Sequence, residues 1–144
     1  MPPILIPFEA KHVMMMQNRE NVMDEPWSLA LEKQLAGPAF TAICDGQVLG
    51  CAGLILPWPG IGLAWMELSE QADQYRLWLT KVTRRVLTDL MRAHRLHRVE
   101  VVVLADSPRN QRWIEALGFT RENGRARAYS TDRRDVIRYE RVKE

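Results

Sequence analysis

The sequence predicts an α/β fold, and three stretches of it carry that prediction. Residues 39–56, AFTAICDGQVLGCAGLIL, contain two apolar runs joined by Asp45 and Gly46, a pair typical of a two-residue hairpin turn. Residues 74–94 place apolar side chains at spacings of three and four, which is the period of a helix. Residues 98–104, RVEVVVL, are rich in β-branched side chains and predict a buried strand. Both faces of the hairpin are apolar, so we expect helices on both faces of the sheet.

Local signals predict the elements of the first half of the chain. ILIPF near the start and IGLAWMEL after the PWPG turn read as strands. Two helical segments lie between ILIPF and the hairpin, and the first of them carries HVMMMQ. The second begins near Pro26 and ends at Gly37, with one apolar stripe formed by Trp27, Leu31 and Leu35.

The second half closes with a short helix and a last strand. Ser107 can cap a helix whose first residue is Pro108, and Gly118 can end it in a left-handed conformation. DVIRYERV, at residues 135–142, predicts the final strand. The predicted element order is therefore β-α-α-β-β-β-α-β-α-β-β.

Length and composition indicate one ordinary globular domain spanning residues 1–144. Hydrophobic residues make up 47% of the chain and charged residues 26%, which excludes a disordered protein. The net charge of +2 is too small to argue for nucleic acid binding. Arginines concentrate near the C-terminus, where they form either a solvated basic face or an anion site: Arg125, Arg127, Arg133, Arg134, Arg138 and Arg141.

The chain is expected to work in a cytoplasm. Its start has no basic leader, and no apolar run approaches the ~18 residues that cross a membrane. The hairpin turn pairs Cys44 with Gln47 and Phe40 with Cys51, so the two thiols do not face each other. We therefore interpret both cysteines as free thiols in a reducing compartment. Their spacing to His94 and His97 fits no zinc pattern, so no metal site is predicted.

The late helix carries a family resemblance. LADSPRNQRWIEALGF, which follows the valine-rich strand, resembles the GNAT family of N-acetyltransferases through Ala105-Asp106 and the LGF of residues 117–119. The element order is similar to that family over nearly the whole chain. The resemblance implies a single-domain, mixed, mostly antiparallel GNAT-like sheet with helices on both faces. More narrowly, the AW and RW…LGF stretches look like small GNAT-like proteins encoded by tailed bacteriophages.

The resemblance implies acetyl-CoA as the acetyl donor and places its phosphates at a helix start. The family motif Q/R-x-x-G-x-G/A falls on residues 74–79, where both small positions are leucine, Leu77 and Leu79. Two leucine side chains there would fill space that the phosphates need. Backbone N–H groups at a helix N-terminus bind phosphate. The donor-binding residues that the resemblance implies are Leu68, Gln74, Tyr75, Arg76 and Asn110.

The general acid and the general base of the reaction are each assigned to a position of this chain. The tyrosine that often protonates the leaving thiolate in the family corresponds to Ile114, which has no proton to give. Tyr75, Tyr129 and Tyr139 are alternatives if the fold brings one to the site. Glu67 is the candidate base, because it shares a strand face with Trp65 near the end of IGLAWMEL. A strand-end glutamate that faces water is the alternative.

Three functions remain open from the sequence. The leading one is transfer of an acetyl group from acetyl-CoA to an amine by direct attack on the thioester. The second is a degenerate GNAT scaffold that binds a protein, phage-encoded and acting in the host cytoplasm or in the virion. The third, a nucleic-acid binder, depends on the C-terminal arginines. Met14, Met15, Met16 and Trp58 are candidates for a protein contact surface, or else they pack against the core and the sheet edge.

Overall fold

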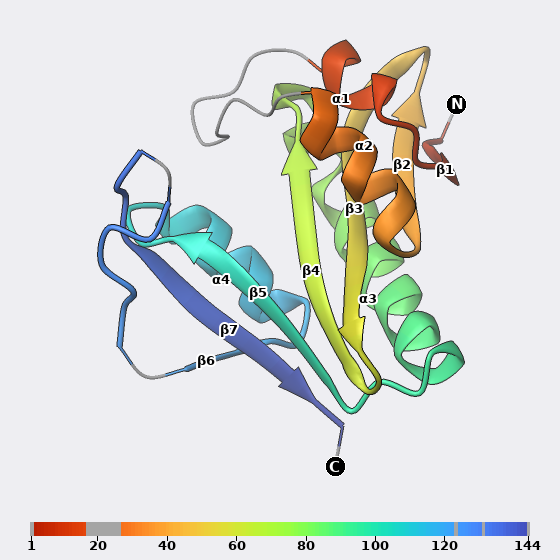
Figure 1. Ribbon diagram of the computed structural model, residues 1–144. Helices are drawn as coiled ribbons and strands as arrows, with labels where there is room; N and C mark the ends of the chain where they lie inside the picture. Colours follow the sequence, from red (N-terminus) through yellow and green to blue (C-terminus); the bar gives the residue numbers. More distant parts are fainter. Residues whose placement is uncertain (1, 17–26, 123, 131, 144) are drawn as a thin grey trace. The chain divides into compact units, whose positions relative to one another are not determined.

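The computed structural model describes residues 2–16, 27–122, 124–130 and 132–143. It confirms the α/β fold with a mixed, mostly antiparallel sheet of seven strands in the order β1-β2-β3-β4-β5-β7-β6 (Figure 1). The elements are β1 Ile4–Pro7, α1 Lys11–Met15, α2 Trp27–Ala36, β2 Ala39–Cys44, β3 Gln47–Trp58, β4 Ile61–Leu68, the 3-10 helix η1 Glu70–Tyr75, α3 Arg76–Ala93, β5 Arg98–Leu104, α4 Pro108–Ala116, β6 Thr120–Arg121 and β7 Val136–Val142.

The chain forms two compact units. The first contains Met1–Leu56 and Ala64–Leu79, and the second contains Pro57–Leu63 and Thr80–Glu144. The strand β4 and the helix α3 contribute residues to both units.

In the first unit, β1, β2 and β3 form an antiparallel sheet around the predicted Asp45-Gly46 hairpin. The expected pairing of Cys44 with Gln47 is confirmed. The expected pairing of Phe40 with Cys51 is wrong, because Cys51 lies opposite Thr41 instead. The register shifts between Ala42 and Ile43. A bulge at that point displaces by one residue every pair that lies farther from the turn. Both cysteines are buried free thiols.

The helix α2 buries a different face from the one expected. Leu31 and Leu35 of the predicted apolar stripe are both exposed. The Trp27 side chain and the predicted start near Pro26 lie outside the described residues. The inward side instead carries the fully buried Ala30 and two polar residues, Lys33 and Gln34. The Gln34 side-chain oxygen accepts the backbone N–H of Ala10 at 2.8 Å, so polar contacts fix the orientation of α2.

Apolar packing in the first unit centres on one face of its strands. A buried cluster consists of Phe8, Val48, Cys51 and Trp65, and the rings of Phe8 and Trp65 meet edge to face with centroids 5.0 Å apart. Trp65 belongs to β4, so this cluster fixes the strand that carries the candidate base. Edge-to-face aromatic pairs stabilise such contacts beyond their buried area.

In the second unit, β5 pairs with β7 along the full length of β5, from Arg98 opposite Val142 to Leu104 opposite Val136. Within this unit, the first three residues of β4, Ile61 to Leu63, pair in parallel with Arg98 to Glu100 of β5. The turn before β4 requires glycine at residue 60: its φ is +87°, and a Cβ there would lie 2.5 Å from the His97 ring.

The helices of the second unit follow the sequence signals only in part. Gly118 has a φ of +98°, which confirms the expected left-handed end of α4. Ser107 precedes α4 as predicted, but its side chain makes no capping hydrogen bond, so that expectation is wrong. The Trp113 indole N–H donates to the Thr80 hydroxyl at 2.8 Å, which ties α4 to α3. The most buried face of α3 consists of Leu79, Val82, Leu87 and Met91.

Candidate functional site

Glu67 lies buried in the first unit, with only 7% of its surface exposed. The alternative of a strand-end glutamate facing water is therefore wrong. Its Oε1 atom lies 4.0 Å from the Nζ atom of Lys33, which comes from α2. The same Nζ atom lies 4.7 Å from the centroid of the Trp65 ring. Glu67 and Trp65 thus share one cation, which confirms that they occupy the same face of β4.

Two buried hydrogen-bond donors flank Glu67 along the chain. The Trp65 indole nitrogen and the Ser69 hydroxyl have no hydrogen-bond partner within the described part of the chain. Residues 65, 67 and 69 alternate along an extended backbone, so their side chains point to one face. Buried donors are rarely left unpaired in proteins. A carbonyl oxygen or a carboxylate of a bound molecule would satisfy them, and Glu67 between them can accept a proton.

Tyr75 is held by a thiol in the same unit. The Cys44 thiol donates to the Tyr75 hydroxyl oxygen over 3.4 Å. The side-chain interaction with Cys44 is the main cause that raises the pKa of Tyr75. Tyr75 therefore keeps its phenol proton at neutral pH, as a proton donor must.

Three features of the helix start at residues 74–79 bear on its predicted role in binding phosphates. The 3-10 helix η1 runs without a break into α3, so residues 74–76 lie inside a continuous helical stretch. Arg76 forms an ion pair with Asp73 at 3.5 Å. Leu77 is 79% exposed at the first turn of α3, whereas Leu79 is buried in the core. Leu77 is therefore the leucine of the pair that lies on the helix surface, and the expected obstruction of the phosphates stays a prediction.

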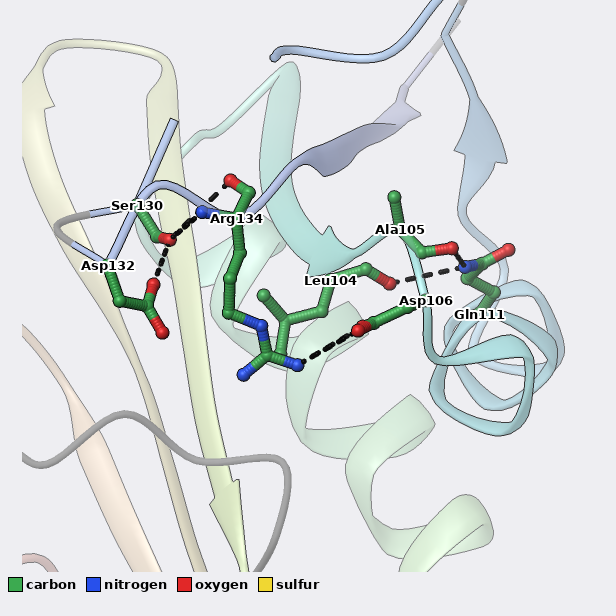
Figure 2. Close-up of polar contacts among 7 residues, drawn as sticks. All are labelled: Leu104, Ala105, Asp106, Gln111, Ser130, Asp132 and Arg134. Carbon is green, nitrogen blue, oxygen red and sulfur yellow. Dashed lines mark hydrogen bonds and ion pairs between the residues drawn. The ribbon is translucent and has the colours of Figure 1, made fainter. Parts of the chain in front are cut away.

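The late helix α4 binds the backbone at the end of β5 through Gln111, a residue that was not predicted from the sequence. The Gln111 amide donates to the backbone carbonyls of Leu104 at 3.2 Å and Ala105 at 3.0 Å (Figure 2). Asn110 lies on the same helix and is partly buried. The sequence signal for this contact is an amide side chain at the fourth residue of a helix that follows a strand.

Ile114 is buried, with 5% of its surface exposed. Its carbonyl accepts the backbone N–H groups of Leu117 at 3.1 Å and Phe119 at 3.3 Å, so the residue helps to end α4. Of the alternative acids, Tyr129 is exposed and Tyr139 is enclosed at 1% exposure. Burial is the main cause that raises the pKa of Tyr139. Tyr75 is therefore the best-placed tyrosine in the unit that contains Glu67.

Several C-terminal arginines are engaged by the chain's own acidic groups. One Arg134 nitrogen lies 3.2 Å from both carboxylate oxygens of Asp106, and the Ser130 hydroxyl accepts the Arg134 backbone N–H at 2.8 Å (Figure 2). Arg125 forms an ion pair with Asp135 at 3.2 Å. These contacts fix the loop before β7 and favour the structural interpretation of this basic segment over an anion site.

Other candidates have simpler placements. Trp58, Met14 and Met15 are exposed, which leaves them available for a partner. No three potential ligands among His, Cys, Asp and Glu gather as a metal site in the described residues. No helix in the described ranges combines the length and apolar character needed to cross a membrane.

Solved structures resemble this chain over almost its whole length. Ard1 from Thermoplasma volcanium matches with a TM-score of 0.81 and 13% identity, covering 99% of this chain and 98% of that one. The chain has the GNAT fold. The ribosomal-protein-S5-alanine acetyltransferase from Vibrio fischeri matches with a TM-score of 0.78 and 14% identity, over 99% and 93% of the two chains.

A third GNAT structure supports the same fold. A mutant of SpeG, the spermidine N-acetyltransferase from Vibrio cholerae, matches with a TM-score of 0.74 and 17% identity, over 97% and 93% of the two chains. No family model matches the sequence. No curated protein matches it either. At these identities the resemblance establishes the GNAT fold, and the chemistry must be argued from the site.

Proposed function

We propose that this chain, acting as a single domain of residues 1–144, transfers an acetyl group from acetyl-CoA to an amine. The observation that carries the proposal is the buried Glu67 carboxylate, flanked on one strand face by Trp65 and Ser69 donors that have no partner among the described residues. This set offers a base for the amine proton and donors for a carbonyl oxygen, the two functions that acyl transfer requires.

Each residue of the site is assigned the role that its side chain can perform in the reaction. Acetyl-CoA would supply an activated acyl thioester. Glu67 accepts the proton that the amine loses as its nitrogen attacks the acyl carbon. Tyr75 is the candidate donor of a proton to the leaving thiolate, because it lies in the same unit as Glu67 and its hydroxyl is held by Cys44. Leu68, Gln74, Tyr75, Arg76 and Asn110 remain the predicted donor-binding residues.

Two features of the helix start oppose tight binding of the donor. At the phosphate end, Leu77 and the acidic Asp73 oppose a close approach. We therefore expect weak acetyl-CoA binding, with a dissociation constant of about 0.1–1 mM, or roughly −5 kcal/mol.

The deciding experiment is calorimetry of the folded chain with acetyl-CoA, followed by an acetyl-transfer assay on a panel of amines. Glu67→Gln should lower turnover about 10²–10⁴-fold with coenzyme binding little changed. Glu70→Gln, which changes an exposed glutamate just beyond the strand, is the matched control and should keep full turnover. If calorimetry shows no heat of binding with acetyl-CoA and no amine is acetylated, the proposed enzymatic function is rejected.

A second function is favoured by two other observations. The position of the family's acid is a packing residue, Ile114, and the helix start presents an exposed Leu77. Both suit a degenerate GNAT scaffold that binds a protein, as a phage-encoded host-directed or virion protein would. The exposed Trp58 and Met15 are its candidate contacts. Under either function the cytoplasm remains the expected location.

A further inference from the structure

The placement of Lys33 is unusual among the lysines of this chain. The sequence has four, Lys11, Lys33, Lys81 and Lys143, and the other three are exposed. Only 13% of the Lys33 side chain is exposed. A long lysine side chain normally keeps its ammonium in water. Lys33 instead directs its ammonium toward the face of β4 that carries the candidate base.

Glu67 and Trp65 are among the groups that lie close to the Lys33 ammonium. The Glu67 carboxylate lies 4.0 Å away, and the centroid of the Trp65 ring lies 4.7 Å away. A carboxylate beside an aromatic face is a favourable environment for an alkylammonium ion. In the proposed reaction, the acceptor is an amine beside Glu67. Lys33 presents a primary amine of the chain itself in that position.

We propose that Lys33 is an acetyl acceptor, so that the chain acetylates itself at this residue. The inference rests on the proposed acetyl-transferase function and names the substrate within the chain. Glu67 first takes a proton from the Lys33 ammonium, and the neutral amine then attacks the acyl carbon of the thioester. A C–N bond forms and the C–S bond breaks, and the second proton lost by the nitrogen passes to the leaving thiolate.

The product differs from the starting state in charge. An amide nitrogen has no positive charge, so acetylated Lys33 loses both its attraction to Glu67 and its cation–π contact with Trp65. Because an amide nitrogen is no longer a nucleophile, the reaction occurs once per chain.

The chain contains a matched control for this pair. Lys11 lies 3.9 Å from the Glu9 carboxylate, a distance close to that between Lys33 and Glu67. The Lys11 and Glu9 side chains are 63% and 54% exposed. The two pairs thus share their chemistry and differ in burial. Acetylation by acetyl-CoA free in solution would favour Lys11, whereas transfer within the site favours Lys33.

The test is peptide mapping by mass spectrometry after incubation of the full chain with acetyl-CoA. We expect one acetyl group on Lys33, formed at a rate per molecule that does not depend on protein concentration. Glu67→Gln should slow this step at least about 10²-fold, and Glu9→Gln should not. Lys33→Arg should remove the modification without moving it to Lys11.

A second measurement uses no acetyl-CoA. Trace labelling with acetic anhydride reports how each lysine reacts with a small reagent, and we expect Lys33 to be the slowest of the four because it is shielded. The expected signature is thus an inverted order: Lys33 last with the anhydride and first with acetyl-CoA. The inference is overturned if the order is the same with both reagents.

The remaining outcomes separate this inference from the proposed function. Acetylation of an external amine with Lys33 unmodified would overturn the inference and leave the proposed function intact. A folded chain that modifies neither Lys33 nor any external amine would overturn both. Equal labelling of Lys33 and Lys11 by acetyl-CoA would show chemical acetylation from solution and would reject self-transfer. The wild-type chain alone gives these results, so they do not depend on the folding of a variant.

Discussion

The Nδ1 atom of His12 lies 2.7 Å from the hydroxyl oxygen of Thr41, and both residues are buried. The backbone N–H of Glu9 donates to the same Nδ1 at 3.1 Å. Nδ1 therefore accepts, the Thr41 hydroxyl donates to it, and the proton of the neutral ring resides on Nε2. Burial is the main cause that lowers the pKa of His12 below its usual value of 6.5.

This arrangement predicts a loss of stability in mild acid. Because the folded pKa of His12 is lowered, the unfolded chain binds more protons below about pH 6.5. The free energy of unfolding should therefore fall as the pH decreases from 7 to about 5, by at most about 1.4 kcal/mol per pH unit from this residue. His12→Gln should reduce that slope in urea melts. The exposed His94, changed to Gln, should leave it unchanged; equal slopes in all three proteins would contradict the assignment.

Packing at Ile114 gives a second prediction. Ile114→Ala removes buried methyl groups from the end of α4 and should cost about 2–5 kcal/mol of unfolding free energy. Thermal melts measure the effect, and any acetyl transfer by the surviving folded fraction should be little changed. An unaltered melting temperature combined with abolished transfer would mean that Ile114 acts in the chemistry rather than in packing.

Leu77 gives the third prediction, which tests the phosphate end of the donor site. Because Leu77 is exposed, Leu77→Gly removes no core packing and costs only about 1 kcal/mol in helix propensity. Acetyl-CoA binding should tighten about threefold to tenfold, or ~0.7–1.4 kcal/mol, in calorimetry. Leu35→Gly, at a leucine of α2 that is 78% exposed, is the matched control and should not change affinity. Unchanged affinity in the folded Leu77→Gly protein would remove the steric argument.

Strands and the late helix could be predicted from the sequence because their signals are local. The bounds of β4 and β5 match the predicted stretches, since alternation and β-branched runs report directly on strands. Gly118 was expected at the end of α4 because few other residues adopt its φ. Cys51 was predicted to pair one residue away from its true partner, because the residues at the turn do not indicate a bulge farther along the hairpin.

The failures come from contacts between distant residues. Leu31 and Leu35 matched a helical stripe, yet α2 is turned the other way by the contacts of Lys33 and Gln34 with partners far along the chain. Hydrophobic periodicity carries no information about such polar pairs. For the same reason Glu67 could be singled out from its strand, but Lys33 could not be foreseen as its neighbour.

The last prediction concerns the charge cluster at the start of β5. Glu100 and Glu140 lie directly opposite each other on β5 and β7, an arrangement that repels. Arg98 offsets this repulsion: its Nε donates to Glu100 at 2.9 Å, and its other nitrogens donate to Glu140 and Glu122. Its planar fork serves several carboxylates at once, which the single ammonium of a lysine cannot reproduce.

We therefore expect Arg98→Met to cost about 2–3 kcal/mol of unfolding free energy, because it leaves three carboxylates together without their donor. Arg98→Lys should recover less than half of that loss. In the Arg98→Met protein, Glu100→Gln should be stabilising, and a double-mutant cycle measures this coupling. Arg138→Met is the control: Arg138 also pairs with Glu122, but at 3.9 Å and 48% exposure, so its loss should cost less than about 1 kcal/mol. If the Arg98 and Arg138 substitutions had equal effects, the cluster would contribute no more than an ordinary surface ion pair.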